Sequence, residues 1–235
     1  MKSLFLQVAL LAAFAAVSSA HFTWLTAERS ELKKGETIRV EIGNGHSFPD
    51  SETAIVMTGL KLFAVSPSGR KTELDAKAEG KHVVASFQAA EDGLHHFYFV
   101  QDRGVLSRTP RGVQPGGRDK NPNATQTFRM VRTASNGGAR ADDAPFQLVA
   151  NRSGNTVTLS VLKNGKPCPG AAVSLLPQGG SERKLGQTGP DGRLEFSDAG
   201  VRGAVLFVAS LIEKKAAGAS YDTDNFTASA RLTIP

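Results

Sequence analysis

The chain has 235 residues, and 28 Lys and Arg against 22 Asp and Glu give it a net charge of +6. Hydrophobic residues make up 40% of the chain, which is enough for one large or two small folded domains. Its single cysteine excludes an intrachain disulfide scaffold and a cysteine-based zinc or iron–sulfur centre. No apolar run after residue 20 approaches the roughly 20 residues of a spanning helix, so we expect no membrane-spanning body.

The first 20 residues have the pattern of a secretory signal peptide. Lys2 forms a positively charged start, Leu4–Val17 is apolar, and small residues at 18–20 precede a cleavage point before His21. The short apolar run, with no cysteine directly after the cleavage point, favours a soluble exported protein over a signal anchor or a lipoprotein. We therefore predict a periplasmic protein whose mature chain begins at His21.

Short segments of alternating polarity follow the signal and predict an all-β fold. Turn signals such as Asn164-Gly165 and Asp191-Gly192 separate them. The predicted strands are 36–42, 60–65, 82–87, 94–100 and 127–131, then 155–162, 171–176, 192–196, 204–209 and 228–234.

The spacing of these strands favours two β-sandwiches of the Ig-like or transthyretin-like kind. We place them at 21–133 and 146–235, with a linker at 134–145. Only 50–60 has helical spacing, and we expect one or two helical turns there. Cys168 is predicted to be a small buried hydrophobic residue.

The segment 103–143 is rich in arginine, glycine and proline and is predicted to be a long loop. From Arg103 to Arg140 it carries eight Lys or Arg and one acid, Asp119. Structureless loops of this length are uncommon inside compact domains. The basic loop 103–140 is therefore a functional loop or a flexible insertion with a short strand near Phe128. It is either simply solvated or docks on an anionic surface or partner. We expect no nucleic acid, because the protein is exported and the segment lacks aromatic stacking residues.

The histidines carry the clearest chemical signal. Cleavage before His21 gives this residue an α-amine beside its imidazole, so it can chelate a metal ion through two nitrogens. His46 lies in a glycine-rich turn directly after a predicted strand, where binding residues collect. His95 and His96 are neighbours in a predicted strand, so they face opposite sides and cannot both bind one ion.

These four histidines, His21, His46, His95 and His96, are the candidate metal ligands. Imidazole and amine nitrogens suit nickel, cobalt, copper and zinc alike. The chain has no G-x-S-x-G motif, no P-loop and no G-x-G-x-x-G motif, and we predict that it is not an enzyme.

Two motifs of the first half resemble those of a known family. HFTWL at 21–25 and GNGHSFPDSE at 43–52 are similar to the periplasmic nickel/cobalt-uptake accessory family, a domain-of-unknown-function family labelled "nickel uptake". In the second half, NGKPCPGA at 164–171 and GPDGR at 189–193 resemble the C-terminal part of that family. The same pattern is typical of transthyretin-like and carboxypeptidase-regulatory sandwich modules.

The resemblance implies an exported protein that binds a divalent transition metal, nickel or cobalt before copper or zinc, and helps deliver it to a membrane transporter. His21 and His46 are the positions that match the motifs of the family. The segment 103–143 carries no signature of the family that we recognise.

Two other functions stay open at this point. One is a non-catalytic structural or adhesive sandwich protein that binds a partner or an anionic surface, with strongly salt-dependent binding. The other is a copper oxidase with a histidine brace, which shares the terminal histidine and a second histidine. One Trp, two Tyr and one Cys argue against the oxidase, because such enzymes show an aromatic substrate face and stabilising disulfides.

Overall fold

A computed structural model of the chain describes residues 21–136, 141, 143–197 and 200–235. Every secondary-structure element assigned in these residues is a β-strand, which confirms the predicted all-β fold. The described part holds no helix that is long and apolar enough to cross a membrane. The predicted signal peptide at 1–20 lies outside the described residues.

The strands of the first half are β1 (Phe22–Ala27), β2 (Glu31–Leu32), β3 (Thr37–Gly45), β4 (Leu60–Val65), β5 (Lys71–Leu74), β6 (Lys77–Glu79), β7 (His82–Gln88), β8 (Gly93–Leu94), β9 (His96–Thr109), β10 (Gly112–Pro115) and β11 (Gln126–Ser135). Those of the second half are β12 (Phe146–Ser153), β13 (Thr156–Lys163), β14 (Lys166–Pro167), β15 (Ala172–Pro177), β16 (Arg183–Gln187), β17 (Arg193–Ser197), β18 (Gly203–Lys214) and β19 (Thr223–Ile234).

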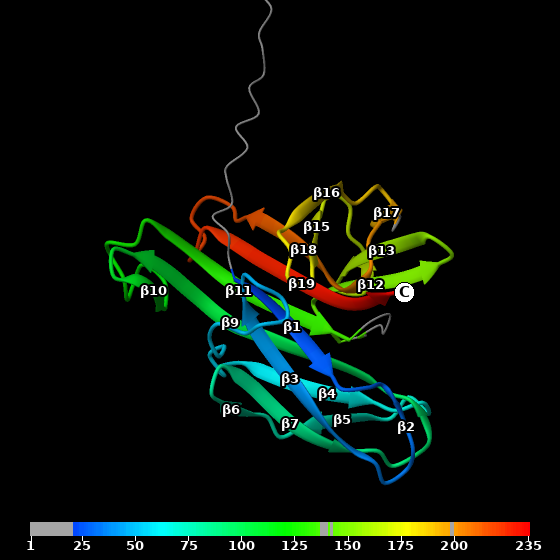
Figure 1. Cartoon of the computed structure of the whole chain (residues 1–235). Coiled ribbons are helices and arrows are strands. Elements are labelled where there is room, and N and C mark those ends of the chain that lie inside the picture. The colour runs from blue at the N-terminus through cyan, green and yellow to red at the C-terminus, as the bar shows by residue number, and fades with distance from the viewer. Residues whose placement is uncertain (1–20, 137–140, 142, 198–199) are drawn as a thin grey trace, which may run out of the picture.

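One large sheet runs through both halves of the chain (Figure 1). Its order is β16-β15-β18-β19-β11-β9-β4-β5, and β10 pairs with β9. The halves meet where β11 and β19 pair in parallel, from Phe128 opposite Thr223 to Ser135 opposite Ala230. The predicted linker at 134–145 therefore begins inside a strand, and its residues 137–140 and 142 lie outside the described residues.

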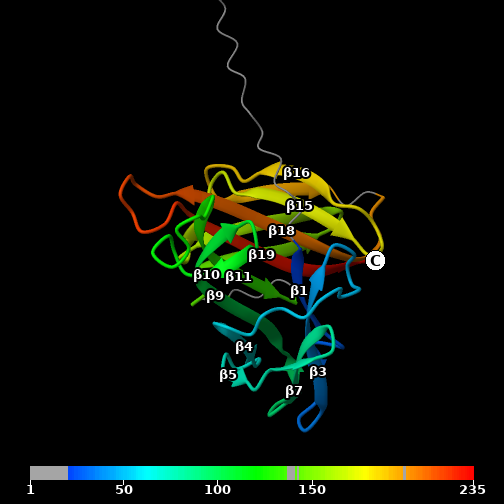
Figure 2. The ribbon, with the colours of Figure 1, turned by 90° about the vertical axis from the view of Figure 1, so that its left-hand side faces the viewer.

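Two smaller sheets cover opposite faces of the large one. The sheet β1-β3-β7-β6 belongs to the first half, and β12-β13-β14 with β17 belongs to the second. Side chains of β11 alternate between the two: Val131 packs in the core of the second half and Ala134 in that of the first. Figure 2 shows the second-half strands above and β3, β4, β5 and β7 below.

Each half has its own hydrophobic core. Phe97 and Phe99 are fully buried in the first core, and Phe146 and Phe207 in the second. Cys168 belongs to the second core, where burial raises the pKa of its thiol, as expected for a small hydrophobic residue. A third cluster joins the halves and contains Trp24, Phe48, Leu176, Leu206 and Val208.

The prediction of a long basic loop at 103–140 is wrong, except that the short strand predicted at 127–131 lies inside β11. β9 continues to Thr109, β10 returns beside it, and β11 begins at Gln126. The turn between β9 and β10 closes at Gly112, whose positive φ of 95° only glycine adopts readily. The helical turns predicted at 50–60 are also absent: the segment is irregular, with a turn at 58–59, and its backbone carbonyls at Val56 and Thr58 accept hydrogen bonds from Gln101.

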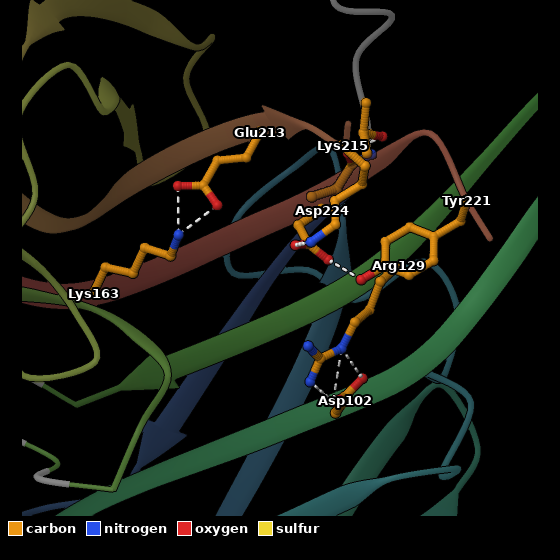
Figure 3. A network of polar contacts seen from close by, with 9 residues as sticks. Asp102, Arg129, Lys163, Glu213, Lys215, Tyr221 and Asp224 are labelled. Atoms are coloured by element: carbon orange, nitrogen blue, oxygen red, sulfur yellow. Dashed lines mark hydrogen bonds and ion pairs between the residues drawn. The ribbon is translucent and has the colours of Figure 1, made fainter. Parts of the chain in front are cut away.

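Charged side chains cross the junction of β9, β11 and β19 on one face of the large sheet (Figure 3). Asp102 accepts hydrogen bonds from Arg129 of the neighbouring strand. Asp224 accepts one from Lys215 at 3.0 Å and one from the hydroxyl of Tyr221 at 2.9 Å. Asp102 is therefore paired within the sheet, and Asp224 with two side chains of the connection between β18 and β19.

The shared sheet predicts that both halves unfold together. Phe99→Ala and Phe207→Ala should each cost about 3–5 kcal/mol, because each removes a fully buried ring from one core. In urea, the fluorescence of Trp24 at the junction and the far-UV circular dichroism should give one coincident transition in both variants.

Val113→Ala is the control, because Val113 is 41% exposed and its truncation should change the free energy of unfolding by less than about 0.5 kcal/mol. Two separate transitions, each moved by only one of the phenylalanine variants, would show that the halves are independent.

Candidate metal centre

The register of β1 and β3 places two of the candidate histidines side by side. These strands pair antiparallel, with Phe22 opposite Gly45. His21 precedes β1 and His46 follows β3, so the same register places the two histidines opposite each other. Their rings lie 4.3 Å apart between centroids, at an interplanar angle of 70°.

Asn44 holds the loop that follows β3. Its side-chain oxygen accepts a hydrogen bond from Thr23 of β1 at 3.0 Å, and its amide donates to Thr53 at 3.1 Å. Its backbone N–H donates to Ser51 Oγ, and its carbonyl accepts from the N–H of Glu52 at 2.9 Å. Asn44 is buried with all of these partners, so the loop returns to the end of β3 in a fixed path.

This path brings Glu52 to the two histidines. The Glu52 carboxylate lies 3.0 Å from His46 Nδ1 and 3.7 Å from His21 Nε2. It also accepts a hydrogen bond from the His46 backbone N–H at 2.8 Å. We call His21, His46 and Glu52 the His–Glu cluster; one donor atom from each residue lies within 4.8 Å of the others.

The loop of the His–Glu cluster rests on the second half of the chain. Phe48 is buried and packs edge-on against Trp24, with ring centroids 5.6 Å apart. Its backbone carbonyl accepts a hydrogen bond from the N–H of Gly179 at 2.9 Å. Trp24 and Phe48 both pack against Leu206 of β18. The two elements that carry the histidines are thus fixed against the large sheet.

The donor set fits a transition-metal ion. Ligands that bind a metal at about 2.0–2.2 Å lie roughly 3–3.5 Å apart, close to the two separations at Glu52. Two imidazoles and a carboxylate suit zinc, copper, cobalt and nickel better than magnesium or calcium. The His46 backbone N–H, followed by its imidazole, holds the pKa of Glu52 below its ordinary value, so the carboxylate is ionised and able to bind a cation.

His95 and His96 do not join this cluster. They lie beyond the far end of β1, where the backbone N–H of His95 donates to the carbonyl of Ser30. The six residues of β1 span about 20 Å, so this end is too distant to share an ion with His21. His95 is buried, with Nδ1 at 2.9 Å from the carbonyl of Gly93 and its ring against Phe87. His96 is half-buried, which lowers its pKa.

Glu52 was not predicted from the sequence as a ligand. It falls within the GNGHSFPDSE stretch that includes His46, so the signal was present in the motif. A carboxylate six residues from a histidine has no defined spacing in a loop. Only the return of the chain to Asn44 decides that the two side chains meet.

A family model described as a domain of unknown function (DUF4198) matches residues 18–201. The chain belongs to the DUF4198 family. The matched range contains the whole His–Glu cluster and the strands of the first half. The match confirms that the chain belongs to a domain-of-unknown-function family, as its motifs predicted.

Other comparisons add little. No curated protein matches the chain. Among solved structures, a DUF4785 family protein from Legionella pneumophila is similar at 13% identity and a TM-score of 0.30, covering 82% of this chain and 54% of that one. The chain thus spans about half the length of the Legionella protein. A segment of two fibronectin type-III domains from chicken tenascin is similar at 14% identity and a TM-score of 0.27, covering 89% and 97%. These weak likenesses carry no functional inference.

The hydrogen bonds of Glu52 predict a graded response to mutation. His46→Ala should raise the pKa of Glu52 only part of the way to its ordinary value, because the backbone N–H remains. Carboxyl ¹³C NMR titration measures this directly. Since the folded pKa is lowered, the stabilisation from this carboxylate is present above its ordinary pKa and is lost as pH falls through the folded value.

Glu91 serves as the internal control, because the hydroxyls of Ser66 and Ser68 lower its pKa and lie outside the cluster. Its pKa should stay the same in His46→Ala. A complete return of Glu52 to its ordinary pKa would contradict the role given to the backbone.

Proposed function

We propose that the mature chain, beginning at His21, is an exported, non-catalytic protein that binds one divalent transition-metal ion as cargo and passes it to a membrane transporter. The main support is the convergence of His21, His46 and Glu52, whose donor atoms lie within 4.8 Å of one another. The signal-peptide pattern of residues 1–20 supports export to the periplasm.

The α-amine of His21 completes the proposed site after cleavage. An amine and an imidazole of one histidine close a six-membered chelate ring through Nδ1, whereas Nε2 points away from the amine. In the uncleaved chain, Nε2 is the His21 ring nitrogen that lies near Glu52. The imidazole of His21 must therefore rotate when the terminal amine and Nδ1 bind the metal. His46 then adds a third nitrogen and Glu52 an oxygen, giving four ligands.

The exposure of the site suits cargo rather than a structural ion. The side chains of His21, His46 and Glu52 are 41%, 42% and 39% exposed. Structural metal sites are closed, whereas an open site lets a partner approach the ion. An open site with a ligand at the chain terminus therefore favours exchange with a transporter.

The proposed donor set is rich in nitrogen, and nitrogen ligands suit nickel, cobalt, copper and zinc. The motifs at 21–25 and 43–52 resemble those of the nickel/cobalt-uptake accessory family, which favours nickel or cobalt as the cargo. The transthyretin-like pattern of the second half is part of the same resemblance and of the same proposal.

Calorimetric titration of the mature chain with nickel, cobalt, copper and zinc tests the site. We expect about one ion per chain, and His46→Ala and Glu52→Gln should each weaken binding by at least about tenfold. His96→Ala is the matched control, because this histidine lies outside the cluster, and its affinity should stay unchanged. Equal affinities in all three variants would refute the site.

One added alanine before His21 tests the chelate separately from the side chains. It moves the free amine away from His21, so affinity should fall by about tenfold or more. Binding should also weaken as pH falls below neutral, because protons compete for the amine and the imidazoles. Unchanged affinity after the extension would refute the chelate.

A further inference from the structure

Arg103 and Arg132 differ from Arg129 of the same junction, which is paired with Asp102. Arg103 of β9 reaches only the sulfur of Met130, at 3.9 Å. Within the described residues, Arg132 of β11 makes no side-chain hydrogen bond or ion pair. Both side chains are half-buried. Buried or half-buried cations are normally paired with an anion, so the absence of an anionic partner at these two arginines requires an explanation.

Strand alternation places the two guanidinium groups on one face of the large sheet, because Arg132 pairs with Gln101 and Arg103 lies two residues after Gln101. Arg129 pairs with Val105 and Val131 with Asp102, so Arg103 and Gly104 together oppose Met130. Arg103 lies on the face of Met130, and the extra residue of the bulge returns Val105 to the face of Asp102. Arg132 lies two residues after Met130 and therefore shares the face of Met130 and Arg103.

The nearby carboxylates point to the opposite face and are already paired. Asp102 holds Arg129, and Asp224 holds Lys215 and Tyr221, as Figure 3 shows. Neither carboxylate can therefore neutralise Arg103 or Arg132. Burial lowers the pKa of Arg132 to about 10, and the positive charge of Arg103 adds to this lowering. The two guanidinium groups therefore repel each other without an internal counterion.

Gln101 adds an unused acceptor beside Arg132, which is its cross-strand partner. Its Nε2 donates to the carbonyls of Val56, at 2.5 Å, and Thr58, at 3.1 Å. These two acceptors fix the orientation of the amide. Its Oε1 is buried and has no hydrogen-bond partner among the described residues. An unpaired buried acceptor is rare and indicates a missing donor.

We propose that Arg103, Arg132 and Gln101 bind a small hydroxycarboxylate. The guanidinium groups match the geometry and charge of a carboxylate, and Gln101 Oε1 accepts a hydrogen bond from the hydroxyl. An amino acid is disfavoured, because its ammonium group would lie beside two guanidinium groups. The site shares no residue with the His–Glu cluster, and the proposal does not rest on the proposed metal function.

The first test is titration of the mature chain with lactate, followed by NMR on the arginine Nε–H and glutamine amide signals. Arg103→Gln and Arg132→Gln should each weaken lactate binding about tenfold to a hundredfold, since each removes hydrogen bonds to a charged group. Arg231→Gln is the matched control. Burial lowers the pKa of Arg231 also, but no second guanidinium contributes to that shift, so lactate binding should stay within about twofold.

Thermal unfolding gives an independent measure. Without ligand, Arg132→Gln should raise Tm, because it removes a cation that has no counterion. Lactate should raise the Tm of the unsubstituted chain and leave that of Arg132→Gln unchanged. A lower Tm in ligand-free Arg132→Gln would overturn the premise of an uncompensated charge.

Two comparison ligands define the chemistry. Acetate lacks the hydroxyl and should bind more weakly than lactate; equal binding would overturn the role of Gln101. Inorganic phosphate should also bind more weakly, and equal or tighter binding would replace the hydroxycarboxylate with a general oxyanion. Absence of saturable lactate binding, or full retention of it in both arginine variants, would overturn the site.

Discussion

The parallel pairing of β11 with β19 is the constraint on which the architecture depends. It joins residues about a hundred positions apart in the chain, from Phe128 and Thr223 to Ser135 and Ala230, into one sheet. Because side chains alternate along each strand, the same backbone supplies Val131 to one core and Ala134 to the other. The two halves therefore have separate cores but share the large sheet, which bounds both cores.

The candidate metal centre depends on the large sheet, because β1 and the loop after β3 pack against it. Trp24 and Phe48 bury their rings against Leu206, which belongs to the second half. The residues that carry the ligands are thus fixed by packing, and Asn44 fixes the returning loop by hydrogen bonds. The ligands themselves stay exposed. A rigid frame with open donor atoms is what an exchangeable metal site requires, because preorganisation supports affinity while exposure permits transfer.

The same sheet also sorts its charges by face. Asp102 and Arg129 pair on one side, whereas Arg103, the residue after Asp102 in β9, faces the other side. Alternation along β9 and β11 thereby separates Arg103 and Arg132 from the carboxylate of Asp102. This arrangement costs stability in the absence of a ligand, because half-buried charges without partners are unfavourable.

The sequence by itself determined the all-β class, the turns, and several strands, since alternation and turn residues are local signals. The prediction at 60–65 coincides with β4, and 204–209 lies inside β18. It also identified His21 and His46 by position. β1 was missed because Thr23, Trp24 and Leu25 are all buried, so a strand covered on both faces shows no alternation.

Tertiary structure alone decided which side chains join the His–Glu cluster and which parts of 103–140 form strands. Glu52 joins the histidines only because the loop closes on Asn44, and His95 lies apart only because β1 separates it from His21. The strands hidden in 103–140 form because β11 finds its partner in β19, far along the chain. Local periodicity records which residues alternate. Register between distant strands depends on packing and hydrogen bonds that no local pattern contains.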